Sequence, residues 1–273
     1  MRARVLTALV GGPVLLAAAI AGDLWWTAVV VLLTLVGLIE WYGLTRHYLG
    51  VPAPADALLG GGLLLLAAAY YAAREPVAAP GFGLGALAFG VVLYALGRAA
   101  ATPARKPLAV GGAAALGALY IAGLFGHFLL LRALEPHGLA LTLMAVAGTW
   151  ATDSGAFFIG RALGGRRLAP AISPAKTVSG AVGGWVCGFV VVLLGGVLWA
   201  AIPLPRALAL AAVVPICCQA GDLLESALKR EAGVKDTGRL LPGHGGVLDR
   251  FDSLLLVVPA VYYLWLLLQW WPL

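Results

Sequence analysis

Residues 24–44 read LWWTAVVVLLTLVGLIEWYGL. A helix needs roughly 20 mainly apolar residues to cross the hydrocarbon core of a bilayer, and this stretch is long enough. Trp25 and Trp26 at its start are typical of the membrane interface, where an amphipathic ring anchors the end of a helix. The stretch therefore predicts a membrane-spanning helix.

The composition extends this prediction to the whole chain. Hydrophobic residues make up 62% of the 273 residues and charged residues 11%, and the mean hydropathy is +0.97. An ordinary soluble protein is about 25% charged, so a soluble globular domain is excluded. The 37 glycines suit the close packing of helices in lipid. We expect an all-α, polytopic integral membrane protein.

Apolar runs recur along the chain, separated by clusters of glycine, proline and charge. They cover residues 5–22, 24–44, 57–73, 81–98, 108–131, 138–160, 177–201, 206–228 and 250–271. We therefore expect about nine transmembrane helices in one continuous membrane domain. About five lie in an N-terminal part, residues 1–137, and about four, with two polar inner loops, in a catalytic half, residues 138–273. The first run also has the features of a signal peptide, but the immediate second run favours a helical hairpin.

The basic residues sort to one side of these runs. If the N-terminus is inside, fifteen of the eighteen Lys and Arg side chains fall in inner loops, and only Arg74, Arg132 and Arg206 fall outside. The positive-inside rule thus predicts an inner N-terminus and an outer C-terminus. This topology explains the net charge of +6, so we expect no nucleic-acid partner.

The inner ends of the last four runs carry nearly all the clustered ionisable groups, and such groups at membrane depth are functional candidates. In the sixth run, Thr149, Thr152 and Asp153 share one helix face. The structural alternative is that the hydroxyls bond back to helix carbonyls while Asp153 caps the helix or pairs with a loop arginine.

The basic loop after that run ends in Ser173, Lys176 and Thr177 at a predicted helix start. Backbone N–H groups at a helix N-terminus, with such side chains, are suited to binding phosphate. For Arg166 and Arg167 in the same loop, topology alone is an equally good explanation.

A polar stripe follows in the eighth run. Asp222, Glu225, Ser226 and Lys229 are spaced so that they lie on one face of an otherwise apolar helix. The alternative is an internal ion pair in which Lys229 neutralises Asp222 or Glu225.

A third cluster precedes and begins the last run. Glycines on both sides of His244 let the backbone approach a ligand and direct amides toward an anion. Asp249 and Asp252 follow, one helical turn apart. Carboxylates from two helices, Asp222 and Asp249, beside this loop predict a site for magnesium, which prefers oxygen ligands. The alternative is a glycine-rich turn with capping aspartates.

These residues resemble a known signature. The sequences SALKR at 226–230, KDTG at 235–238 and LPGHGGVLDRFD at 241–252 are similar to the signature of the phosphatidate cytidylyltransferases, also called CDP-diacylglycerol synthases. The resemblance extends to residues 221–225, 173–177 and 152–154, and so covers the C-terminal half. Ala175 departs from it, where a polar or basic residue is expected.

The resemblance implies a metal-dependent nucleotidyltransferase that transfers CMP from CTP to phosphatidic acid, giving CDP-diacylglycerol and pyrophosphate in phospholipid biosynthesis. It implies Mg²⁺ held by Asp222 and Asp249, a second cation such as K⁺, a homodimer, and a multi-pass protein of the plasma (inner) membrane whose active site faces the cytoplasm. Asp222, Asp249 and Lys229 are then catalytic. The implied substrate-binding residues are Asp153, Ser173, Lys176, Thr177, Ser226, Arg230, Lys235, Asp236, His244, Gly245, Gly246 and Arg250.

Two other functions are compatible with the residues. One is a related cytidylyltransferase that acts on a different lipid phosphate. The CDP-alcohol phosphotransferases also join CDP and lipid, but residues 153–155 lack their D-x-x-D-G-x-x-A-R spacing. The other is a transporter, which predicts broken helices in two matching halves. Here the charges gather at one end of one half.

Overall fold

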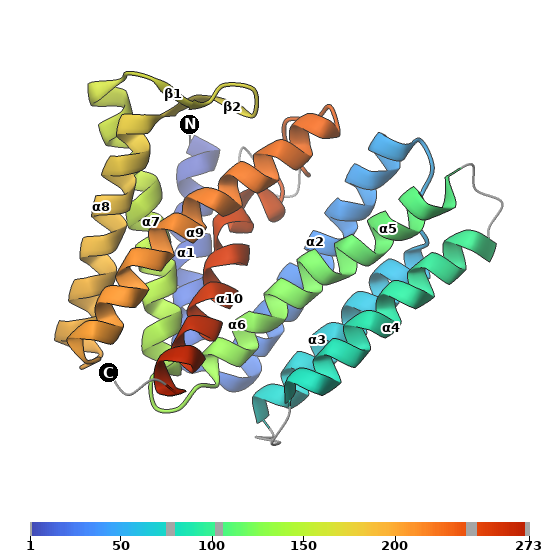
Figure 1. Ribbon diagram of the computed structural model, residues 1–273, viewed down its shortest axis with the longest axis horizontal. Coiled ribbons are helices and arrows are strands. Elements are labelled where there is room, and N and C mark those ends of the chain that lie inside the picture. Colours follow the sequence, from blue (N-terminus) through green and yellow to red (C-terminus); the bar gives the residue numbers. More distant parts are fainter. Residues whose placement is uncertain (1, 75–79, 102–105, 239–244, 271–273) are drawn as a thin grey trace. The chain divides into compact units, whose positions relative to one another are not determined.

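The computed structural model describes residues 2–74, 80–101, 106–238 and 245–270, which form a helical protein (Figure 1). In chain order the elements are α1 (Arg2–Ala21), α2 (Asp23–Leu49), η1 (Asp56–Gly60), α3 (Gly61–Arg74), α4 (Pro80–Ala101), α5 (Pro107–Gly117), η2 (Ala118–Gly123), α6 (Leu124–Arg132), α7 (Gly138–Leu163), β1 (Arg167–Ala169), β2 (Ser173–Thr177), α8 (Val178–Leu194), η3 (Gly195–Trp199), α9 (Leu204–Glu231) and α10 (Leu248–Trp270).

Within the described residues, each predicted apolar run coincides with a helical segment. Three segments contain a π-helical turn, where η1 leads into α3, η2 joins α5 to α6, and η3 ends α8. Among the residues that the structure describes, six segments are long and apolar enough to cross a membrane by length and composition: Asp23–Leu49, Asp56–Arg74, Pro107–Arg132, Val178–Trp199, Leu204–Glu231 and Leu248–Trp270. The helical membrane class is therefore confirmed, whereas the number of nine spans stays a prediction.

A short hairpin interrupts the helical fold between α7 and α8, where the sequence analysis expected a loop. Strands β1 and β2 pair antiparallel, with Arg167 opposite Thr177 and Ala169 opposite Ser173. The pairing satisfies backbone groups that an irregular loop would leave to water. Thr177 ends the hairpin and caps α8, because its hydroxyl accepts a hydrogen bond from the Gly180 N–H at 3.1 Å.

The chain divides into two compact units. The first comprises Met1–Ala133 and Glu231–Arg250, and the second comprises Leu134–Arg230 and Phe251–Leu273. The division does not follow the order of the chain, because the segment that leads into α10 groups with the N-terminal helices.

Tryptophans of α2 hold the first unit together. The Trp26 indole N–H donates to the Phe128 carbonyl at 2.9 Å, and the Trp41 indole N–H donates to the Ala113 carbonyl, also at 2.9 Å. A buried indole needs such an acceptor to avoid an unpaired N–H. Gly117 makes the second contact feasible, since a methyl group there would overlap the Trp41 ring.

Ion pairs join helix ends within the first unit. Asp23, which begins α2, lies 3.6 Å from the Arg74 guanidinium at the end of α3. Asp56, which begins η1, lies 2.6 Å from the Arg98 guanidinium in the last turn of α4. Each pair joins the start of one segment to the end of another, as expected for antiparallel neighbours.

Helices α8 and α9 of the second unit are joined by hydrogen bonds from side chains to backbone carbonyls. The Trp185 indole of α8 donates to the Ala212 carbonyl of α9 at 3.2 Å. The Gln219 side chain of α9 donates to the Ala181 carbonyl of α8 at 3.1 Å. These bonds fix α9, which carries the predicted polar stripe, against α8.

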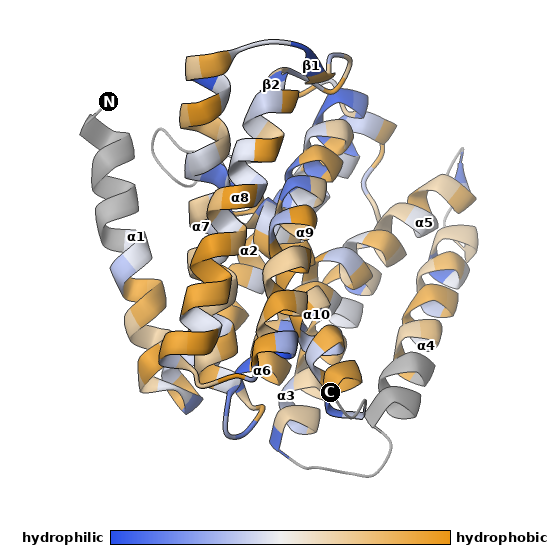
Figure 2. Cartoon of the chain, turned by 60° about the vertical axis from the view of Figure 1, so that its left-hand side comes forward, coloured by the Kyte–Doolittle hydropathy of each residue, from blue (hydrophilic) through white to orange (hydrophobic). Residues whose placement is uncertain are grey.

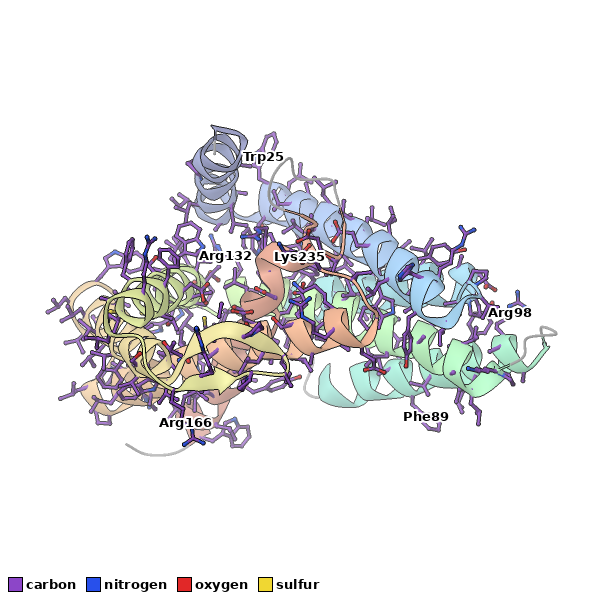
Figure 3. All side chains as sticks on the ribbon, turned by 90° about the horizontal axis from the view of Figure 1, so that it is seen from above. Trp25, Phe89, Arg98, Arg132, Arg166 and Lys235 are labelled. Carbon is purple, nitrogen blue, oxygen red and sulfur yellow. The ribbon has the colours of Figure 1, made fainter. Side chains whose placement is uncertain are left out.

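Hydrophobic residues predominate along much of each helix, with hydrophilic residues at helix ends and in the hairpin (Figure 2). Large hydrophobic side chains point outward, among them Trp25 and Phe89, which are 68% and 65% exposed (Figure 3). An apolar exterior of this kind suits lipid rather than water.

We expect Gly117→Ala to destabilise the first unit by about 1 to 3 kcal/mol, because the added methyl group overpacks against Trp41. Thermal unfolding in detergent measures the loss. Gly112→Ala, in the same helix but with open space around its added methyl group, is the matched control and should unfold at or slightly above the wild-type temperature. Equal unfolding temperatures for the two variants would contradict this packing.

Candidate functional site

Asp222 of α9 is the centre of the site in the second unit. Its Oδ2 lies 2.6 Å from the Lys176 Nζ of β2, and its Oδ1 accepts a hydrogen bond from the Ser226 hydroxyl at 3.3 Å. The Lys176 and Asp222 side chains are 26% and 33% exposed, so a ligand can reach both. The structure thus brings Lys176, predicted from the basic loop, together with Asp222 and Ser226 of the polar stripe.

A close helix crossing explains why polar groups gather beside Asp222. A Cβ atom on the preceding residue, Gly221, would lie 2.5 Å from the Asp252 carbonyl oxygen and 2.9 Å from the Ser253 Cα atom. Only glycine allows α10 to pass α9 at this distance. Asp252 therefore lies near enough to Asp222, Asp153 and Lys229 to interact with them electrostatically.

Lys229 forms the predicted internal ion pair, but with Glu225 rather than Asp222. Its Nζ lies 3.1 Å from Glu225 Oε1, one helical turn away, and the two side chains are 14% and 3% exposed. The structural alternative is thus confirmed for Glu225. Lys229 still faces the carboxylate cluster through its interaction with Asp252.

Thr149 and Thr152 of α7 have a structural role, because their hydroxyls bond back to carbonyls of the same helix. The Thr149 hydroxyl donates to the Ala145 carbonyl at 2.8 Å, and the Thr152 hydroxyl donates to the Gly148 carbonyl at 2.7 Å. Asp153 differs, because its Oδ1 lies 3.4 Å from the Cys218 Sγ and the carboxylate interacts with Asp252. Asp153 therefore belongs to the polar cluster.

The hairpin and the end of α9 contribute the remaining predicted residues of the second unit. Arg230 Nε donates to the Ile172 carbonyl at 3.3 Å, which joins the end of α9 to the hairpin. Ser173 is half-buried at the start of β2, and Thr177 caps α8. The side chains of Lys176 and Arg230 together give this margin of the site a positive charge.

Asp249 is the centre of the predicted residues in the first unit. Its Oδ2 accepts hydrogen bonds from the Gly246 N–H at 2.8 Å, the Thr237 N–H at 2.9 Å and the Thr237 hydroxyl at 3.0 Å. These donors hold the carboxylate at the first turn of α10.

The neighbours of Asp249 are more open to solvent. Lys235, Asp236 and Arg250 are exposed, and Lys235 is labelled in Figure 3. Gly245 has a φ of 83°, a conformation that favours glycine. His244 lies outside the described residues, so its predicted ligand contact stays a prediction.

Glu40 of α2 is a residue that the sequence analysis missed. It is 7% exposed, and it accepts hydrogen bonds from the Val247 N–H at 2.8 Å and the Leu248 N–H at 2.9 Å. A signal was available, because Glu40 is the single charged residue in the apolar run 24–44. A lone carboxylate at membrane depth marks a functional candidate.

The oxygen donors of both units suit a hard cation, since magnesium binds carboxylates and completes its shell with water and phosphate oxygens. Among the described residues, no group of three His, Cys, Asp or Glu side chains is placed to hold a metal ion unaided. Asp222 and Asp249 belong to different units, and their predicted convergence on a metal ion stays a prediction.

The fold and these residues define a multi-helix membrane protein with a polar site of carboxylate, lysine and hydroxyl groups. Residues 2–268 match the model of the Cytidylyltransferase family, and the chain belongs to this family. The membership agrees with the resemblance that the C-terminal motifs indicate.

Several curated relatives carry the name phosphatidate cytidylyltransferase. That of Bacillus subtilis (strain 168) is 46% identical over 151 residues, which are 55% of this chain and 56% of that protein. That of Staphylococcus saprophyticus is 45% identical over 138 residues, 49% of this chain and 52% of that protein. That of Brucella suis biovar 1 is 49% identical over 133 residues, 49% of each chain. The chain spans about half the length of the curated relatives it matches.

A double-mutant cycle should detect the contact between Lys176 and Asp222. We expect Lys176→Met and Asp222→Asn to be non-additive by about 0.5 to 1 kcal/mol in the free energy of unfolding, because the ion pair is partly exposed. Unfolding in mixed detergent micelles measures the coupling. The control pairs Lys176→Met with Thr142→Val, whose buried hydroxyl donates to the Gly138 carbonyl within α7, and this pair should be additive. Additivity in both cycles would contradict the ion pair.

Proposed function

We propose that this protein is a phosphatidate cytidylyltransferase, which transfers CMP from CTP to phosphatidic acid and releases pyrophosphate, giving CDP-diacylglycerol for phospholipid biosynthesis. The observation that carries the proposal is the grouping of Lys176, Asp222 and Ser226 in a chain of the Cytidylyltransferase family. The names of the curated relatives support the choice of lipid substrate.

In the proposed reaction, a phosphate oxygen of phosphatidic acid attacks the α-phosphorus of CTP. A new P–O bond forms, the bond between the α-phosphorus and the bridging oxygen breaks, and pyrophosphate leaves with the electron pair. Phosphatidic acid is already ionised at neutral pH, so the residues need not include a strong base. Their main task is to bring two anions together and to orient them.

Basic residues supply the positive charge for this task. Lys176 and Lys229 lie in or beside the carboxylate cluster of the second unit, and Arg230 lies at its margin. Charge-assisted hydrogen bonds from such side chains are strong contacts for phosphate oxygens. We assign substrate contacts also to Lys235, Arg250 and His244 on the basis of the sequence motifs.

We assign magnesium to Asp222 and Asp249, with a second cation such as K⁺ beside them. When bound, the divalent ion would neutralise the triphosphate and stabilise the leaving oxygen. The donors on Asp249 Oδ2 support this role, because a held carboxylate presents its charge in one orientation.

The substrates require a membrane setting, since the lipid comes from the bilayer and CTP from the cytoplasm. We propose a multi-pass protein of the plasma membrane, with an inner N-terminus, nine spans, an outer C-terminus and an active site that faces the cytoplasm. The ion pairs of the first unit support the alternation. Asp23 and Arg74 both fall on the predicted outer side, and Asp56 and Arg98 on the predicted inner side. We also propose that the protein forms a homodimer, on the basis of the family resemblance alone.

Purified protein in detergent should release pyrophosphate from CTP when phosphatidic acid and magnesium are present. We expect Asp222→Asn and Asp249→Asn each to lower the rate at least 100-fold, about the loss typical when an electrostatic catalytic group is removed. Chelation of magnesium should have the same effect.

Asp23→Asn is the matched control, because it removes an exposed carboxylate whose partner is Arg74. This variant should keep the wild-type rate. Wild-type turnover in both the chelated sample and the Asp222→Asn protein would refute the assignment.

Reporter fusions test the proposed topology. Alkaline phosphatase, which is active only outside the inner membrane, should be active when fused after Pro136 and inactive when fused after Pro52 or Arg230. A fluorescent reporter that folds only inside is the reciprocal control, and it should give the opposite pattern. The same activity at all three positions would contradict the alternating topology.

A further inference from the structure

The carboxylate of Glu40 connects α2 to the start of α10. Its two oxygens accept hydrogen bonds from consecutive backbone amides, Oε1 from Val247 and Oε2 from Leu248. The first N–H groups of a helix have no partner within the helix and carry partial positive charge. Glu40, which lies far from α10 in the sequence, therefore caps its N-terminus from outside.

Glycines on either side of residues 239–244 form a cradle around the same carboxylate. A Cβ atom on Gly238 would lie 2.6 Å from Glu40 Oε1, and a Cβ atom on Gly246 would lie 2.5 Å from Glu40 Cδ. No other side chain fits at either position without displacing Glu40. These two glycines of the motif thus pack against a protein carboxylate.

The hydroxyl of Thr237 connects Glu40 with Asp249. It lies 3.3 Å from Glu40 Oε2 and 3.0 Å from Asp249 Oδ2. Because a hydroxyl has one proton, the two carboxylates share this donor. Asp249 Oδ2 also accepts the N–H groups of Thr237 and Gly246, so the same two short segments, one on each side of residues 239–244, contact both carboxylates.

We propose that Glu40 is a positioning residue for the cytidylyltransferase reaction: it holds the two described flanks of the glycine motif so that Asp249 is presented in one orientation. The inference rests on the proposed function, in which Asp249 is a magnesium ligand. By this inference α2, in the N-terminal part of the chain, has a specific role in the site. The sequence motifs placed all residues of that site in the C-terminal half.

Burial and donors favour positioning over direct contact with substrate or metal. Glu40 is 7% exposed, and each of its oxygens receives a backbone N–H. A buried carboxylate is costly unless such bonds compensate for the lost water. The electrostatic interaction between Glu40 and Asp249 adds to that cost, so the arrangement depends on all of these donors together.

Glu40→Gln tests the proposal with little change in shape. The amide group has one acceptor oxygen, so one of the Val247 and Leu248 N–H groups would face another donor. We expect the apparent magnesium constant, which is the magnesium concentration that gives half-maximal pyrophosphate release, to rise about 10- to 100-fold. A loss of this size is typical when a residue that orients a metal ligand is changed. The Michaelis constant for phosphatidic acid should stay within about twofold, because loss of orientation at one ligand spares the lipid site.

Hydrogen exchange gives a readout independent of turnover. In Glu40→Gln, the amides of Thr237 and Gly246 should exchange faster although they bond to Asp249, not to Glu40. Thr34→Val is the matched control on the same helix, since Thr34 is buried and its hydroxyl donates to the Val30 carbonyl. This variant should match the wild type in both measurements.

A folded Glu40→Gln protein with the wild-type magnesium constant and wild-type exchange at Thr237 and Gly246 would overturn the proposal. If Glu40→Gln does not fold, Thr237→Val decides, because it removes only the shared hydroxyl. An unchanged magnesium constant in that variant would also overturn the proposal. If instead the wild type releases no pyrophosphate from CTP and phosphatidic acid, the proposed function fails, and exchange alone then tests the link between Glu40 and Asp249.

Discussion

A carboxylate in an apolar helix has to find donors within the protein, and this constraint organises both units. In the first unit, backbone amides at the start of α10 satisfy Glu40, and Asp249 is held by the same short segment. In the second, Lys176 and Ser226 satisfy Asp222. Leaving such a group unpaired at membrane depth would cost several kcal/mol. The helices are therefore placed where their carboxylates can be satisfied, and polar sites result.

Glycine has two physical roles in this chain, and they should be kept apart. Along the helices it permits close approach, as at Gly117 beside Trp41 and at Gly221 beside α10. In the motif that precedes α10, Gly238 and Gly246 make room for the Glu40 carboxylate. The sequence interpretation assigned the motif glycines to ligand binding. In the structure, Gly246 packs against Glu40 and donates its N–H to Asp249.

The hairpin between α7 and α8 shows how a connection can become part of a site. Its second strand delivers Lys176 to Asp222, and its turn accepts a hydrogen bond from Arg230. The sequence interpretation recognised the residues but not the strands, because three to five residues with two prolines nearby carry little β signal. Backbone pairing, rather than propensity, makes this hairpin.

Periodicity and composition determined the class of fold, because a run of about twenty apolar residues has few stable alternatives to a membrane helix. Local spacing also determined the polar stripe of α9, since it needs only the geometry of one helix. Only the tertiary structure decided which partners charges take across elements: Lys176 for Asp222, and the start of α10 for Glu40. Pairing across elements depends on how helices cross. A glycine such as Gly221 permits a close crossing, but the sequence alone does not show which helix packs against it.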